Sequence, residues 1–170
     1  MPRYCGIMSV RPIVMFPDPW LRMIAAPTTA FDEALRRLAA DLVETMREAG
    51  GIGITAPHIG IATRLVVLEL APAEGPRIYV NPTIVWASNE RSRQAEGSVS
   101  MPGVTAEIER SARVRVRYQD LDGAEQSEEA DGLRAVCHQH EIDQLDGIFW
   151  TQRLSALKRD QLVRRYRKSR

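Results

Sequence analysis

The sequence contains little cysteine, since only Cys5 and Cys137 occur among 170 residues. Two cysteines do not suggest the disulfide framework of a small secreted protein. They are typical of a chain in a reducing compartment, so we expect a cytoplasmic location. The sequence also lacks an apolar run of the roughly 20 residues that a membrane-spanning helix needs. Its first residues, MPRYCGIMSVRPI, lack the basic segment and long apolar stretch of a secretory signal. We therefore expect no membrane partner.

Strong charge of one sign is absent as well, because 23 lysine and arginine residues face 22 aspartate and glutamate residues. A net charge of +1 gives no general reason to expect DNA as a partner. Hydrophobic residues make up 44% of the chain, which suits one domain with a sizeable core. We predict an N-terminal extension at residues 1–7, with Met8 as an alternative start, and a single domain at residues 8–170.

Apolar spacing predicts a first helix over about 32–49. Its buried face is expected to carry Leu35, Leu38, Ala39, Leu42 and Met46. Thr29 with Asp32 offers a capping pattern, and Gly50 with Gly51 ends the helix. A glycine-rich loop, GGIGITAPHIG, follows at 50–60.

The middle of the chain reads as strands. Residues 64–70 form a short apolar run, and IYVNPTIVW at 78–86 predicts two strands separated by an Asn-Pro turn. Residues 112–120 alternate, with Val114, Val116 and Tyr118 on one face, and meet the next strand through an Asp122–Gly123 turn. Helices are predicted over about 131–145 and 154–167. This order indicates an α+β fold with a helix packed among antiparallel sheets.

The stretch CHQHEIDQLDG, residues 137–147, resembles a metal-binding helix that lacks one ligand. His140 and Glu141 are adjacent, and Gln144 stands four residues after His140, where a second histidine would grip the same ion. The predicted inner face consists of Leu133, Val136, Cys137, His140 and Gln144, whereas His138 faces away. Taken alone, the pattern also suits a buried histidine with a hydrogen-bonded partner.

Three segments in order carry a resemblance to one family. They are GIGITAPHIG (51–60), EGSVSMPG (96–103) and QHEIDQLDG (139–147). Together they resemble the motifs G-x-G-x-A-A-x-Q, E-G-C-x-S and Q-H-E-x-D-H of the peptide deformylase family. The stretches FPDPWLR, LVETMREAGGIG, YVNPTI and LSALKR are similar to that family too. The resemblance implies the deformylase α+β fold and removal of the N-formyl group from N-terminal methionine.

The resemblance also implies roles for single residues. Glu141 matches the general base, His58 matches a glutamine that polarises the formyl oxygen, and the backbone amide of Val99 would join it. The family holds a divalent metal, iron or zinc, with one cysteine and two histidines. These three positions match Ser98, His140 and Gln144. The expected substrate contacts are Gly53, Gly97, Val136 and Cys137.

The departures from the family fall on the chemistry. A serine hydroxyl and a glutamine amide are weak neutral donors where the family has a thiolate and an imidazole, so Ser98 and Gln144 are not expected to be ligands. Histidine in place of glutamine at position 58 is expected to remove an amide donor of fixed geometry. One hypothesis is a protein that keeps the fold and peptide cleft with little or no deformylase activity. The alternative is an active deformylase with a remodelled metal site that includes His58.

Two kinds of partner follow from the resemblance. The cleft would take an N-formylated peptide or nascent chain. The end of the last helix is rich in lysine and arginine, which is usually a solvated face. Basic residues also favour RNA phosphates, and in bacterial deformylases this helix is associated with the ribosome, so ribosomal RNA is a second interpretation.

Overall fold

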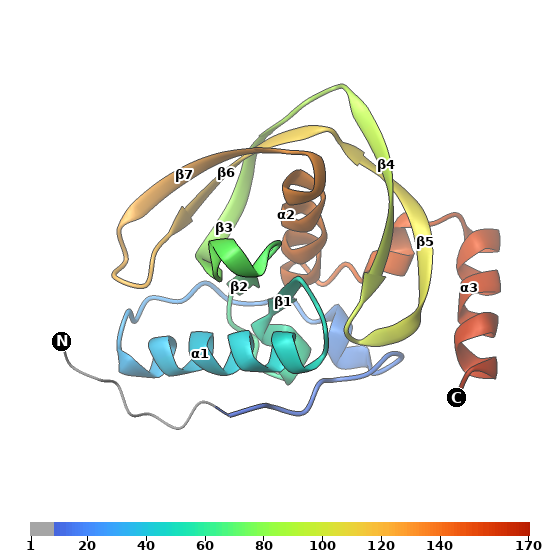
Figure 1. The fold of residues 1–170 in the computed structure, drawn as a ribbon, viewed down its shortest axis with the longest axis horizontal. Coiled ribbons are helices and arrows are strands. Elements are labelled where there is room, and N and C mark those ends of the chain that lie inside the picture. Colours follow the sequence, from blue (N-terminus) through green and yellow to red (C-terminus); the bar gives the residue numbers. More distant parts are fainter. Residues whose placement is uncertain (1–8) are drawn as a thin grey trace.

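The computed structural model describes residues 9–170, so the expected N-terminal extension lies outside the described residues. Figure 1 follows the chain through its elements. The helices are α1 (Glu33–Glu48), α2 (Gly132–Leu145) and α3 (Ala156–Lys168). The strands are β1 (Gly53–Thr55), β2 (Leu65–Leu68), β3 (Arg77–Ala87), β4 (Arg91–Ser98), β5 (Met101–Ser111), β6 (Arg113–Gln119) and β7 (Glu125–Asp131). Short 3-10 turns cover Pro19–Arg22, Ala56–Ile59, Pro72–Glu74 and Trp150–Arg153.

Two antiparallel sheets enclose one central helix. Five strands pair in the order β1-β2-β3-β6-β7, and β4 pairs with β5 in a separate two-stranded sheet. Figure 1 shows α2 between these sheets, α1 along one side, and α3 on the outer side of β5. This is the predicted α+β arrangement with the motif helix among antiparallel sheets. Among residues 9–170, no helix is long and apolar enough to cross a membrane.

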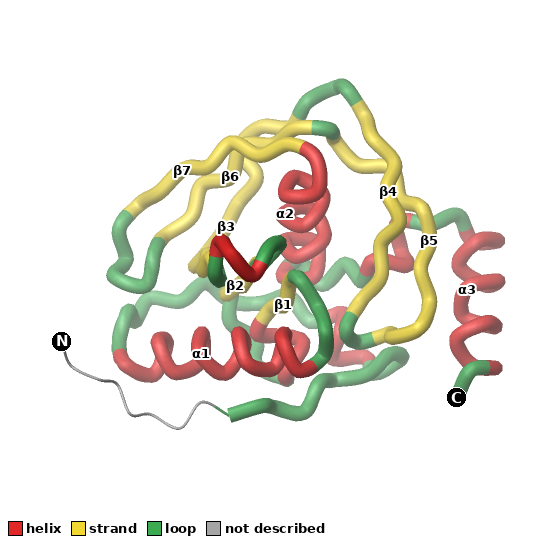
Figure 2. Tube along the Cα trace, in the orientation of Figure 1, coloured by secondary structure: helices red, strands yellow, loops and turns green. Residues whose placement is uncertain are grey.

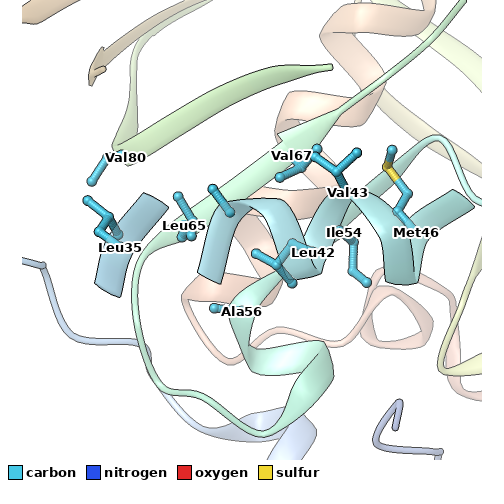
Figure 3. Close-up of a cluster of buried hydrophobic side chains, with 10 residues drawn as sticks. Leu35, Leu42, Val43, Met46, Ile54, Ala56, Leu65, Val67 and Val80 are labelled. Atoms are coloured by element: carbon cyan, nitrogen blue, oxygen red, sulfur yellow. The ribbon is translucent and has the colours of Figure 1, made fainter. Parts of the chain in front are cut away.

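Helix α1 forms where the apolar spacing predicted it. The carboxylate of Asp32 accepts a hydrogen bond from the backbone N–H of Leu35, so the cap is Asp32 rather than Thr29. Gly50 follows the helix with a φ of +69°, a conformation that ends helices and favours glycine. The buried face of α1 packs against β1, β2 and β3, as Figure 3 shows for Leu42, Met46 and their neighbours.

Two local predictions were wrong. The glycine-rich loop is ordered as β1 and the 3-10 turn Ala56–Ile59, because Gly53–Thr55 pairs with β2. The expected Asn-Pro turn lies inside one continuous strand, β3. Asn81 has a φ of +52° there, and a bulge between Val80 and Thr83 accommodates Pro82, which has no N–H for the ladder. Asn81 is held by its side-chain hydrogen bonds to Thr28 and Gln119.

The hairpin of β6 and β7 is confirmed, and so is the last helix, which begins two residues later than predicted. Helix α3, drawn in red in Figure 2, begins at Ala156, because the side chain of Ser155 caps it, and Leu154 lies before it. Leu157 is 69% exposed. The residues of α3 that reach the core are Leu162 and Tyr166, which lie further along the helix.

Candidate active site

The three motif segments meet around one pocket of about 550 Å³. Its walls come from the segment between α1 and β1, from the 3-10 turn after β1, from β4 and the following loop, and from α2. The lining residues are Ala49, Gly50, Gly51, Ile52, Gly53, His58, Ala95, Glu96, Gly97, Ser98, Val99, Pro102, Gly103, Leu133, Val136, Cys137, His140 and Glu141. Nearly all the site residues expected from the sequence are therefore brought together.

Gln144 is the expected site residue that is not among the residues lining this pocket. Its side chain is 2% exposed, and its Nε2 donates a hydrogen bond of 2.7 Å to the backbone oxygen of Leu21. Val136 and Cys137 are buried as predicted. The prediction that Leu133 lies on the same buried face was wrong: it is 44% exposed, because it lies in the first turn of α2, at the pocket wall.

His138 was expected to point away from the side of α2 that carries His140 and Gln144. It is nevertheless buried. Its ring packs edge-on against Tyr79, and its Nε2 lies 3.0 Å from a carboxylate oxygen of Glu128. It is 1% exposed because the five-stranded sheet covers that side of α2. His138 is thus a core histidine with a hydrogen-bonded partner.

Glycines allow the pocket walls to approach closely. A Cβ atom on Gly53 would stand 2.7 Å from Oε1 of Glu141, and one on Gly51 would stand 2.8 Å from Cγ1 of Val99. A Cβ on Gly97 would lie 3.2 Å from the backbone oxygen of Val104. The motif glycines therefore make room for Glu141 and Val99 at the pocket wall.

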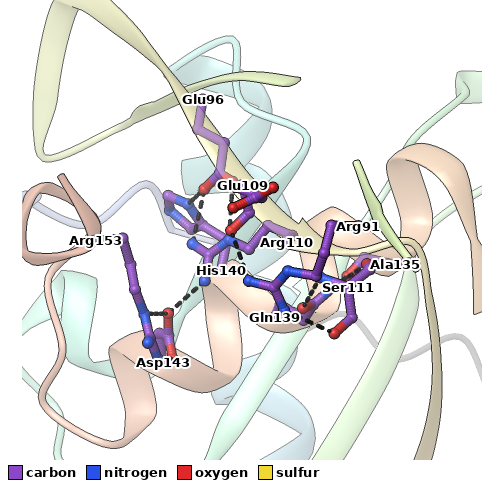
Figure 4. Close-up of polar contacts among 10 residues, drawn as sticks. All are labelled: Arg91, Glu96, Glu109, Arg110, Ser111, Ala135, Gln139, His140, Asp143 and Arg153. Atoms are coloured by element: carbon purple, nitrogen blue, oxygen red, sulfur yellow. Dashed lines mark hydrogen bonds and ion pairs between the residues drawn. The ribbon is translucent and has the colours of Figure 1, made fainter. Parts of the chain in front are cut away.

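Glu96 of β4 orients the ring of His140 through its Nδ1. Its Nδ1 lies 2.8 Å from Oε1 of Glu96. Arg110 of β5 donates to both oxygens of the same carboxylate, at 2.9 Å each, and also to Asp143 of α2 (Figure 4). Arg153 completes the set with two hydrogen bonds to Asp143, at 2.6 and 2.9 Å. These bonds fix α2 against β4 and β5 and leave Nε2 of His140 as its free ring nitrogen.

No role was assigned from the sequence to Glu96, Arg110, Asp143 or Arg153. A signal for Arg110 did exist. Ile108 and Arg110 are two residues apart on β5, and both point inward at 2% and 4% exposure. An arginine at an apolar-facing position of a strand indicates a buried carboxylate partner.

Burial and neighbouring charges shift three pKa values in the site. Burial opposes the charge of Glu96, but its hydrogen bonds with Arg110 and His140 prevail and lower its pKa to about 2. Burial also opposes a charge on His140, yet the bond to Glu96 and the nearby Glu141 carboxylate raise its pKa. Burial raises the pKa of Glu141 to about 7, against the opposing influence of His140. Glu141 is thus poised to exchange a proton near neutral pH.

The remaining polar residues of the pocket differ in what they offer a ligand. The hydroxyl of Ser98 accepts a hydrogen bond of 3.1 Å from the backbone N–H of Ser100. Nε2 of His58 and Oε2 of Glu141 are both buried without a hydrogen-bond partner among the described residues. Burial raises the pKa of the Cys137 thiol to about 12, so it is an unreactive wall residue.

Within residues 9–170, no three histidine, cysteine, aspartate or glutamate side chains are grouped so as to hold a metal ion.

Comparison with known proteins identifies the family. The family model described as polypeptide deformylase matches residues 10–160. The chain belongs to the peptide deformylase family.

Relatives and solved structures support the same family assignment. A Brucella suis protein named peptide deformylase-like is 69% identical over 161 residues, which cover 95% of this chain and 98% of the relative. A Brucella suis peptide deformylase is 46% identical, with coverage of 95% and 94%. The crystal structure of a peptide deformylase from Legionella pneumophila aligns with a TM-score of 0.89 and 37% identity, over 94% of this chain and 95% of that one. The fold of this chain is therefore that of peptide deformylases.

Proposed function

We propose that this deformylase-family protein binds N-formylated peptides or nascent chains in its pocket but has little or no deformylase activity of the family type. Deformylases are in general metal-dependent and act on N-formylated nascent peptides. The pocket, the motif glycines and Glu141 support binding of such a peptide. The donor atoms at Ser98, His140 and Gln144 do not suit the metal centre of the family.

The orientation of Gln144 carries this proposal. Its amide nitrogen is a donor and is already bonded to the backbone oxygen of Leu21. The hydroxyl of Ser98 is neutral and accepts from Ser100. Of the three positions that match the family's ligands, only His140 offers a good ligand atom, its Nε2. These residues do not fit the family's iron or zinc.

Glu141 alone does not replace the missing centre. Water without a metal keeps a pKa near 15.7. A carboxylate with a pKa of about 7 is too weak a base to produce useful hydroxide from it. A bound formyl group would therefore persist, and the protein would hold its peptide without cleaving it.

The raised pKa of Glu141 and its unpartnered Oε2 also favour a second candidate, an active deformylase with a remodelled metal site. Glu141 has the proton affinity that a general base needs near neutral pH. Against this candidate, Brucella suis has both a deformylase-like relative and a less similar peptide deformylase, so one organism keeps both kinds of chain.

One set of measurements separates the two candidates. The purified protein is assayed for bound transition metal, for release of formate from a formyl-Met-Ala-Ser peptide, and for binding of the intact peptide. We expect well under one equivalent of metal, no turnover above that of Glu141→Gln, and saturable binding. A metal content close to one per chain that survives dialysis, with formate release that depends on Glu141, would establish the remodelled enzyme instead.

We further propose that α3 contacts ribosomal RNA, and the expected cytoplasmic location is consistent with this partner. Its basic residues, with one beyond its end, are Lys158, Arg159, Arg164, Arg165, Arg167, Lys168 and Arg170. None of these forms an ion pair within residues 9–170.

Cosedimentation of the protein with ribosomes should weaken as the salt concentration rises. It should fail for Arg164→Glu with Lys168→Glu and persist for Arg115→Glu on the five-stranded sheet. Equal loss in both variants would indicate nonspecific attraction.

A further inference from the structure

His58 is held by the residue that ends β1. The backbone N–H of Thr55 donates a hydrogen bond of 2.9 Å to Nδ1 of His58, and the Thr55 hydroxyl lies 2.9 Å from the same nitrogen. A backbone N–H is always a donor, so Nδ1 must present its lone pair. Thr55 is completely buried, and the 3-10 turn Ala56–Ile59 folds the ring back onto it. The contact is therefore part of the fold.

The other ring nitrogen must then carry the hydrogen. His58 is 1% exposed, and burial together with the charge of His140 lowers its pKa to about 3. A neutral imidazole has a single N–H, and with Nδ1 as acceptor this hydrogen is on Nε2. Nε2 has no hydrogen-bond partner within the described part of the chain, and His58 lines the pocket. The pocket thus contains a buried donor without an acceptor.

We propose that Thr55 locks His58 in the tautomer with hydrogen on Nε2, so that His58 donates to an oxygen of the bound ligand and does not hold a metal. A metal ligand needs a lone pair on Nε2. Moving the hydrogen to Nδ1 would set it against the N–H of Thr55 in a buried place, which is costly. Thr55 is accordingly a positioning residue, and His58 is the binding residue.

This inference differs from two expectations drawn from the sequence. His58 was expected to remove an amide donor of fixed geometry, whereas its N–H is a donor whose direction the fold fixes. His58 was also the candidate for rescuing a metal site, and the lock excludes it from that role. The ligand class is an acceptor oxygen, as in a formyl, peptide or carboxylate group. That the oxygen belongs to a formyl group rests on the proposed function.

The tautomer can be measured without altering the protein. The chain has three histidines, so ¹⁵N-labelled imidazole signals can be assigned with one substitution at a time. Between pH 5 and 8, we expect His58 to show a protonated Nε2 and an unprotonated Nδ1, with no titration. A hydrogen on Nδ1, or a doubly protonated ring, would overturn the inference. The substitutions serve only to assign the signals, and the tautomer itself is read from the wild-type protein without a ligand.

Binding of formyl-Met-Ala-Ser tests the donor role. We expect His58→Leu to weaken binding about tenfold, since one hydrogen bond to a buried group is lost, and His58→Gln to stay near the wild type. In a titration with diamagnetic Zn²⁺, we expect the Nε2 signal of His58 in the wild type to stay that of a protonated nitrogen. Unchanged peptide affinity in His58→Leu, or Zn²⁺ ligation by Nε2, would overturn the inference. If the wild type bound no peptide, the proposed function would fail, while the tautomer and Zn²⁺ results would still decide this inference.

Discussion

Gly53 and Glu141 are packed so closely that a methyl group on Gly53 would stand 2.7 Å from Oε1 of the glutamate. The same methyl group would stand 2.9 Å from the side chain of Leu68. We expect Gly53→Ala to displace the carboxylate and to lower the free energy of unfolding by about 1–3 kcal/mol, as overpacking does. Urea unfolding measures this loss, and peptide binding reports the distorted pocket.

A double-mutant cycle isolates the contact. In a Glu141→Ala background the carboxylate is gone. Gly53→Ala should then lower the free energy of unfolding distinctly less, because only the side chain of Leu68 would still have to move. Equal costs in the two backgrounds would show that the crowding of Glu141 does not matter to Gly53.

The pH dependence of stability should report Glu141. Its pKa is about 7 in the folded state and 4.5 as an ordinary glutamate. The folded state therefore binds more protons between these values, and stability falls as pH rises from about 4.5 to 7. The span corresponds to on the order of 3 kcal/mol. In urea unfolding, the free energy of unfolding of Glu141→Gln relative to that of the wild type should rise by on the order of 3 kcal/mol between pH 4.5 and 8. Parallel stability curves would contradict a buried, protonated Glu141.

The buried arginine of the site should matter far more than an exposed one. Arg110 faces Glu96 and Asp143 with its side chain 4% exposed. Arg110→Met would leave the buried carboxylate of Glu96 with His140 alone and that of Asp143 with the half-exposed Arg153 alone, and we expect a loss of about 3–5 kcal/mol in unfolding free energy. Arg115 forms an exposed pair with Glu129, so Arg115→Met should cost about 1 kcal/mol or less. Similar losses for both variants would contradict the central position of Arg110.

The sequence predicted the fold well where local rules and packing agree. The apolar stripe of α1 and the alternation of β6 each face a core, so their periods survive folding. The prediction failed where distant partners decide. Asn81 stays inside β3 because Thr28 and Gln119 bind it.

The site shows the same division. Motif order was enough to bring His58, Ser98 and His140 to one pocket, because the resemblance carried their positions. The bond from Gln144 to Leu21 joins residues 123 apart, and no spacing rule predicts it. The lock of His58 by Thr55 is local, at a separation of three residues, but it depends on the turn that the sequence suggested was a loop.

The last prediction is repair of the metal site by Ser98→Cys with Gln144→His. The oxygen of Leu21 now accepts from Gln144, and an imidazole in that position can donate its Nδ1–H to the same oxygen. Its Nε2 would then be free as a ligand, which is how metal-bound histidines are usually oriented, and as Glu96 already orients His140. Three good ligands instead of one should give about one Zn²⁺ or Fe²⁺ per chain after dialysis. Each single variant should retain much less metal. Release of formate from formyl-Met-Ala-Ser should appear only in the double variant and vanish on adding Glu141→Gln. A double variant that binds no more metal than Ser98→Cys would show that the main chain at Leu21 cannot orient the new imidazole.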